Sequence, residues 1–300
     1  MKTILVPTDF SKNALDALGY AIPLAESTGA RLLIFHCAQL SAYALAGAPP
    51  DKLEEFINSD ELFKMKLLRE HVVKAYAAAG IKTMPGSTKL LVENNPLLVE
   101  KIMEVALRHE ADLIITGTRG ATGWGRFFFG SNTSALIGKS SIPVLAIPPG
   151  CKFKKIKKIA WSADLENLQQ EMKMVLPFAE NLHASVDVLY LDYGTDAGEA
   201  HLHVAKKLIG DSVYKKISLV RKKATIEFTM IRQLKKILSK RPYQLLVMFT
   251  KERGFWEKLL YGGKTEEMSY ELELPLLSMR KQLPATVSAI HKAQNSLQRS

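Results

Sequence analysis

The sequence predicts an α/β protein made of two tandem doubly wound domains, each with a five-stranded parallel sheet. Three observations support this class. Short apolar segments alternate with segments whose apolar residues recur at helical spacing. The apolar segments lack a polar face and therefore suit strands buried on both sides, and the whole pattern occurs twice. With 300 residues, 47% of them hydrophobic, the chain can bury two cores.

The first half alternates strands and helices from its start. Ser11 is expected to cap the first helix, and Asn95 followed by Pro96 to begin the third. A fourth helix is expected to begin near Gly130 and Ser131. We expect strands at 2–7, 30–38, 81–93, 111–116 and 142–147, and helices at 14–24, 61–80 and 97–109.

The second half repeats this order in a shortened form. Its opening strand, loop and helix resemble those of the first half, and Asp164 stands at the place of Asp9. The interval from Asp9 to Gly130 is 121 residues, and that from Asp164 to Gly262 is 98. The difference predicts that the second copy has lost most of the loop at 38–60.

The repeat also defines the predicted domains. The first spans residues 1–149 and the second residues 150–284, and 285–300 is a polar tail expected to be flexible. A constant offset of 132 residues aligns Leu145 with Leu277 in the last strand of each copy. We expect these strands to pair, because an exposed apolar edge strand promotes aggregation, and the halves then form an intrachain pseudo-dimer. The sequence leaves a homodimer of two such chains open.

The charge distribution argues for a solvated basic surface over a nucleic-acid interface. The net charge of +11 arises in the second half: residues 1–150 hold 15 Lys or Arg against 14 Asp or Glu, and residues 151–300 hold 26 against 16. No aromatic stacking platform interleaves these cations, so nucleic acid is not the partner we expect. An acidic protein partner stays open as an alternative.

Composition also predicts the compartment. The opening MKTILVPTDF carries Pro and Asp where a signal peptide has an unbroken apolar segment, and no apolar run is long enough to span a membrane. The two cysteines, Cys37 and Cys151, lie far apart and outside any CxxC pattern. This excludes a disulfide framework and a structural zinc site. We therefore expect a cytoplasmic protein.

A glycine-rich segment, GTRGATGWGRFFFGSNTS at 117–134, follows the fourth predicted strand. Glycines let backbone N–H groups approach an anion, and a helix beginning near Ser131 directs its positive end to the same place. The loops after the first and second strands meet there, because ligands of open parallel sheets lie beyond the carboxyl ends of the strands. The segment therefore predicts a phosphate site. Trp124 and the three phenylalanines at 127–129 are expected to pack the loop against the domain or its neighbour.

The spacing Gly117-x2-Gly120-x9-Gly130-Ser131, together with VPTDFS at the front and the dipeptide HC closing the second strand, resembles the nucleotide-binding branch of the universal stress protein family. The resemblance covers 1–148 and, more weakly, 154–280. It implies a tandem universal stress protein with a Rossmann-like fold of the adenine nucleotide alpha hydrolase-like type. It further implies that the ligand is ATP, ADP or AMP, with Mg²⁺ bound through the phosphates.

The resemblance implies where the nucleotide is held. Around the ribose and a divalent ion on the phosphates it places Pro7, Thr8, Asp9, Thr116 and Gly117, with Asp9 as the metal-side carboxylate. Around the phosphates it places Arg119, Gly120, Gly130, Ser131, Asn132 and Thr133. The backbone of Cys37 is expected to meet the edge of the adenine.

The second copy departs from this pattern. The 132-residue offset puts Phe249 at the place of Gly117, Glu252 at that of Gly120 and Gly263 at that of Ser131. Side chains there obstruct a close backbone approach, and Glu252 repels a polyphosphate. We expect no ATP in this copy, and we expect Asp164 to cap a helix.

These observations favour a regulatory adenine-nucleotide-binding protein of the stress response over a fast enzyme. His36 is expected to be a hydrogen-bonded structural histidine, and the sequence contains no GxSxG, HExxH or carboxylate pair. Slow ATP hydrolysis beside Asp9 stays open. The alternative function is a nucleotide-independent interaction module that uses the paired domains and the basic second half.

Overall fold

The computed structural model describes residues 1–39, 52–118, 130–250 and 274–281. The elements of the first half are β1 (Thr3–Pro7), α1 (Lys12–Thr28), β2 (Arg31–Ala38), α3 (Leu53–Ala78), β3 (Thr88–Asn94), α4 (Leu98–Arg108), β4 (Leu113–Gly117), α5 (Ser131–Lys139) and β5 (Val144–Ile147). Those of the second half are β6 (Lys158–Ser162), α6 (Leu168–Asn181), β7 (Ser185–Asp192), α7 (Asp196–Gly210), β8 (Ile217–Lys223), α8 (Met230–Leu238), β9 (Leu245–Thr250) and β10 (Leu276–Arg280).

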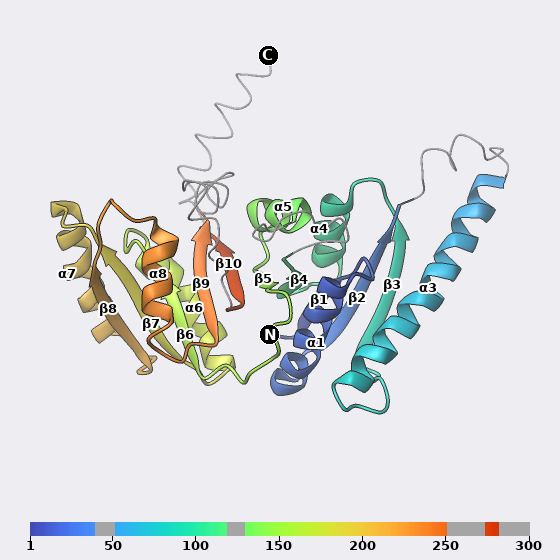
Figure 1. Cartoon of the computed structure of the whole chain (residues 1–300), viewed down its shortest axis with the longest axis horizontal. Helices are drawn as coiled ribbons and strands as arrows, with labels where there is room; N and C mark the ends of the chain where they lie inside the picture. The colour runs from blue at the N-terminus through green and yellow to red at the C-terminus, as the bar shows by residue number, and fades with distance from the viewer. Residues whose placement is uncertain (40–51, 119–129, 251–273, 282–300) are drawn as a thin grey trace, which may run out of the picture.

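These strands form one ten-stranded sheet in the order β3-β2-β1-β4-β5-β10-β9-β6-β7-β8 (Figure 1). Each half has the same order, in which its first strand lies between its second and its fourth. The paired strands are parallel within each half, which confirms the predicted parallel sheets. The α/β class follows from this alternation of buried strands and covering helices.

The two halves join through their last strands. β10 pairs with β5 in the antiparallel direction, and Leu277 lies opposite Leu145. These are the residues that the sequence offset makes equivalent, so the pairing is self-complementary, as across a two-fold axis. The predicted pairing of the two edge strands is confirmed.

Helices cover both faces of the sheet. Residues of α1, α3, α6 and α7 share one continuous core with the strands, and residues of α4, α5 and α8 pack on the opposite face. Trp161 and Tyr20 are the largest fully buried side chains. Among the described helices, none is both long and apolar enough to cross a membrane.

The predicted starts of two helices need correction. The helix predicted at 61–80 begins at Leu53, because Glu54 and Glu55 favour a first helical turn. The third helix begins at Leu98, and Asn95 instead accepts a hydrogen bond from the N–H of Leu97 at 2.8 Å in a turn just before it.

The second copy is shortened in its helix as well as in its loop. The connection from β2 to α3 uses residues 39–52, whereas that from β7 to α7 uses only 193–195. In addition, α7 has 15 residues where α3 has 26. The predicted tail at 285–300 lies outside the described residues.

Candidate functional site

A cavity of about 440 Å³ opens at the carboxyl ends of β1, β2 and β4. It lies where the strand order reverses, between β1 and β4, which is the usual ligand position in an open parallel sheet. The described residues that the sequence assigned to the site all line it, namely Pro7, Thr8, Asp9, Cys37, Thr116, Gly117, Gly130, Ser131, Asn132 and Thr133. Arg119, Gly120 and the segment from Trp124 to Phe129 lie outside the described residues.

The loop after β1 carries Asp9, which lies just before the N-terminus of α1. The Asp9 carboxylate accepts a hydrogen bond from the N–H of Ser11 at 3.0 Å, and the Ser11 hydroxyl accepts one from the N–H of Ala14 at 3.2 Å. Ser11 is therefore the N-cap of α1, as predicted. Between them Phe10 adopts a left-handed backbone with φ of 63°, which few side chains do without strain.

Asp9 is the acidic side chain that the sequence assigned to the metal. Within the described parts of the chain, no three His, Cys, Asp or Glu side chains gather into a group that could hold a metal ion. Mg²⁺ takes most of its ligands from water and from substrate phosphates. Any magnesium at Asp9 would therefore depend on a bound polyphosphate.

Gly117, at the end of β4, is required by packing. A Cβ at this position would lie 2.5 Å from the carbonyl oxygen and 2.8 Å from the carbonyl carbon of Asn13. Asn13 belongs to the first turn of α1. The glycine therefore allows the backbone of α1 to approach β4, which closes this side of the cavity. The sequence analysis, which placed Gly117 beside the ribose, did not predict this contact.

The start of α5 is held against the end of β4 by two hydrogen bonds. The N–H of Gly130 donates to the carbonyl of Thr118 at 2.6 Å, and the Thr133 hydroxyl donates to the carbonyl of Gly117 at 2.8 Å. The hydroxyl of Thr133 is thus used within the protein. The amides of Ser131, Asn132 and Thr133 belong to the first helical turn, where no preceding carbonyl can accept from them, so this end of the cavity suits an anion.

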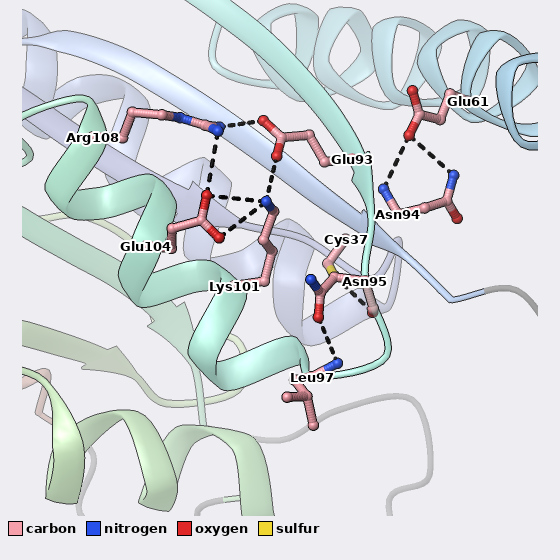
Figure 2. Close-up of polar contacts among 9 residues, drawn as sticks. All are labelled: Cys37, Glu61, Glu93, Asn94, Asn95, Leu97, Lys101, Glu104 and Arg108. Carbon is pink, nitrogen blue, oxygen red and sulfur yellow. Dashed lines mark hydrogen bonds and ion pairs between the residues drawn. The ribbon is translucent and has the colours of Figure 1, made fainter. Parts of the chain in front are cut away.

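The backbone of Cys37 extends past the end of the β1 ladder. Pairing between β1 and β2 ends at Pro7 opposite Phe35, and the N–H of Thr8 donates to the Phe35 carbonyl at 2.8 Å. Main-chain groups alternate between the two neighbours of a strand, so those of Cys37 point to the same side as those of Phe35, into the cavity. The Cys37 thiol donates to the Asn95 carbonyl at 3.4 Å, and burial raises its pKa (Figure 2).

An ion-pair network fixes the wall made by α4. Lys101 lies 2.7 Å from the Glu93 carboxylate on β3 and 3.1 Å from Glu104, and Arg108 contacts the same two carboxylates (Figure 2). Although burial acts against it, hydrogen bonds from Lys101 and Arg108 hold the pKa of Glu93 below its ordinary value. The network joins α4 to β3 and so positions Ile102, which lines the cavity.

Two histidines flank the Phe10 ring beneath the cavity. The ring centroid of Phe10 lies 4.3 Å from that of His36 and 5.6 Å from that of His71. Nδ1 of His36 donates to the carbonyl of Thr8 at 2.8 Å, because a carbonyl can only accept. This agrees with the predicted structural role of His36. Burial is the main cause that lowers the pKa of both imidazoles.

Acidification below about pH 6.5 is expected to destabilise the fold through these two histidines. Their pKa lies below the ordinary 6.5, so the unfolded chain binds protons in this range that the folded chain does not. Their contribution to the free energy of unfolding is present above pH 6.5 and is lost as the pH falls toward the lowered pKa values of the two imidazoles. Urea unfolding from about pH 7.5 to pH 5 measures it, and the double variant His36→Gln, His71→Gln should flatten the slope. An unchanged slope would contradict the assignment.

Lys64 is a site residue that sequence reasoning missed. It comes from α3 and lines the same cavity. One turn earlier Glu61 accepts hydrogen bonds from the backbone N–H of Asn94 at 3.0 Å and from its side-chain amide at 3.1 Å (Figure 2). The only sequence signal was a lysine three residues after a glutamate on a predicted helix, which is common on solvated helix surfaces.

The cavity at the corresponding place in the second half is smaller. Its cavity measures about 150 Å³ and is lined by Phe249, whose ring centroid lies 6.1 Å from that of Trp161. Lys281 lies 2.9 Å from Asp164 and 3.0 Å from the buried Glu171. Glu252 and Gly263, which also bear on the prediction for this copy, lie outside the described residues.

Asp164 does not have the predicted capping role. The N-cap of α6 is Asn167. Asp164 instead accepts from the N–H of Glu166 at 3.1 Å, and Leu165 between them has φ of 67°. This turn repeats the geometry of Asp9, Phe10 and Ser11, so the two copies share the loop while the second one adds the ion pair to Lys281.

Comparison with known proteins finds relatives that are described as stress proteins. A family model described as the universal stress protein family matches residues 1–148. A universal stress protein of Thermus aquaticus is 35% identical over 147 residues, which are 49% of this chain and 98% of that protein. The stress response protein NhaX of Bacillus subtilis is 30% identical over 162 residues, covering 48% of this chain and 96% of that protein.

The whole chain is also similar to a solved structure. The universal stress protein from Archaeoglobus fulgidus DSM 4304 superposes with a TM-score of 0.65 at 17% identity, over 93% of this chain and 98% of that one. At this identity the likeness shows the fold alone. It extends over both halves, so the paired architecture is that of a known fold.

Proposed function

Since the chain belongs to the universal stress protein family, we propose that residues 1–149 form a domain that binds one adenine nucleotide, ATP, ADP or AMP. Nucleotide binding regulates a stress response, and the protein does not act as a fast enzyme on the nucleotide. Residues 150–284 form a second domain whose equivalent site is degenerate. Mg²⁺ accompanies the nucleotide, bound by its phosphates beside Asp9.

The observation that carries this proposal is the juxtaposition of a helix N-terminus with a sheet crevice of suitable size. The first-turn amides of α5, which have no acceptor within the helix, supply donors for phosphate oxygens, and Gly117 lines the cavity beside them. The cavity of about 440 Å³ falls within the usual range for small-molecule sites, roughly 300–1,000 Å³. Apolar Leu98, Ile102 and Leu136 offer a surface for a base.

The second half lacks these features in its described residues. Phe249 occupies the position equivalent to Gly117, and the Lys281 ammonium already neutralises carboxylates at the base of the small cavity. A polyphosphate there would compete with two carboxylates for one lysine. We therefore propose a stoichiometry of one nucleotide per chain.

Titration of the purified protein with ATP and Mg²⁺, followed by calorimetry, is expected to saturate at one site per chain. Gly120→Glu and Gly130→Val should abolish binding, because each puts a side chain or a charge where a phosphate must lie. Their far-ultraviolet circular dichroism and unfolding midpoints should match those of the unmodified protein. Two equal sites, or no binding up to millimolar ATP, would reject the proposal.

The second candidate function is a nucleotide-independent interaction module. It is favoured by the exposed cations Lys222 and Lys223 on β8, which is the outermost strand of the second half in the described sheet. Such a surface would bind an acidic protein, and its affinity would fall steeply with salt. Partner binding that survives both glycine substitutions would favour this candidate.

A further inference from the structure

We propose that Lys64 is a specificity-determining residue that binds a second anionic group on the ligand. The cavity then selects adenine nucleotides that carry a phosphate on the ribose in addition to the 5′-phosphate. This inference rests on the proposed function, because it names the ligand class of the same site. It follows from where Lys64 lies, from its lack of a counter-ion among the described residues and from the way α3 is held.

The cavity has an electropositive feature at each of its two sides. On one side lies the first turn of α5, which is held against the end of β4. On the other side lies Lys64, carried by α3, which packs against β2 and β3. With strands about 4.8 Å apart, two to three strand spacings separate these features, roughly 10–15 Å. One phosphate group cannot contact both, so a ligand that uses both needs two separated anionic groups.

Lys64 has no counter-ion in the described parts of the chain. It forms no ion pair or hydrogen bond with any described residue, and its ammonium lies 5.9 Å from the ring centroid of Phe63. Its charge reaches His36, where it helps to lower the imidazole pKa. Asp9 and Asp60 are the carboxylates whose charges reach the same imidazole. A partly buried ammonium that faces a cavity gains a charge-assisted hydrogen bond when a phosphate enters.

The turn of α3 that carries Lys64 is held by specific hydrogen bonds. On the outer side of this part of the helix, Phe56, Leu62 and Phe63 are exposed, so apolar burial contributes little there. The carboxylate of Glu61 anchors the turn to Asn94 at the end of β3 (Figure 2). Lys64 is therefore positioned before any ligand binds, and pre-positioned groups discriminate better than mobile ones.

The groups that line the cavity between its two sides suit a nucleoside. The backbone of Cys37 offers a donor and an acceptor, and Leu98 and Ile102 offer apolar contact. With the 5′-phosphate at α5, the 2′- and 3′-positions of the ribose are the places from which a second phosphate can extend toward β2 and α3. Adenosine 3′,5′-bisphosphate and adenosine 2′,5′-bisphosphate are the probes that match this description.

Calorimetric titration of the full chain with 5′-AMP and with the two bisphosphates tests the proposal. At least one bisphosphate should bind about tenfold more tightly than 5′-AMP, as expected for one added charge-assisted contact. In Lys64→Gln this ratio should fall to near one, while the Kd for 5′-AMP changes less than about threefold. The matched control is Lys66→Gln, an exposed lysine on the same helix, which should keep the ratio.

The outcomes distinguish a failure of nucleotide binding from a failure of the role given to Lys64. If no adenine nucleotide binds, the proposed function itself fails. If 5′-AMP binds and the bisphosphates show no preference, or if Lys64→Gln keeps the preference, the role of Lys64 is overturned and the proposed function stands. Glu61→Ala, which frees the turn of α3, should reduce the ratio without removing 5′-AMP binding, and unchanged unfolding midpoints would show that the fold is intact.

Discussion

Trp161→Ala should lower the free energy of unfolding by about 3–5 kcal/mol, the usual cost of removing a buried tryptophan. Trp161 is fully buried in the middle of β6, in the core that the sheet shares with α6. Its indole packs near Phe249, so its removal leaves a cavity at the centre of the second half. Equilibrium unfolding in urea measures the loss.

The same variant probes how the two halves depend on one another. The nucleotide cavity is lined by first-half residues, and the halves meet at β5 and β10. Under conditions where Trp161→Ala stays folded, we expect the nucleotide Kd and the stoichiometry to remain unchanged. Trp161→Phe is the control, with a smaller loss of about 1–2 kcal/mol, because most of the ring volume is retained. A weakened Kd in the folded variant would show that the second half supports the site.

The second large effect is expected at Gly117. Gly117→Ala should cost about 1–3 kcal/mol of stability and should weaken nucleotide binding at the same time. The new Cβ would lie 2.5 Å from the Asn13 carbonyl oxygen, and neither backbone can move without displacing α1 from β4. A shift of α1 also moves its N-terminal loop, which carries Asp9. One substitution therefore affects both the packing and the site.

Gly19→Ala is the matched control for this experiment. Gly19 lies in the interior of α1 with open space where a Cβ would be, so alanine there should stabilise the helix by up to about 1 kcal/mol. Its nucleotide affinity should not change. Thermal unfolding and calorimetric titration of both variants give the comparison. A Gly117→Ala protein as stable as the unmodified one would mean that α1 does not approach β4 as closely as described.

Local sequence patterns predicted the elements that have strong periodicity. The apolar segment around Leu145 and its equivalent around Leu277 predicted both strands and their pairing, because an apolar edge requires cover, whereas the antiparallel direction came from the structure. Boundaries were less accurate. The start of α3 at Leu53 was missed, since two prolines precede it in the sequence and the apolar period is weak in its first turns.

By itself the sequence determined the alternation of strands and helices, the internal repeat and the loops that meet at the carboxyl ends of β1, β2 and β4. These are properties of neighbouring residues, and the parallel topology then brings the loop ends together. The tertiary structure alone decided that Gly117 faces Asn13, that Lys281 reaches Asp164, and that Lys64 enters the cavity from α3. Each of these contacts joins segments far apart in the chain, so it depends on how helices pack on the sheet and leaves no periodic signal in the sequence.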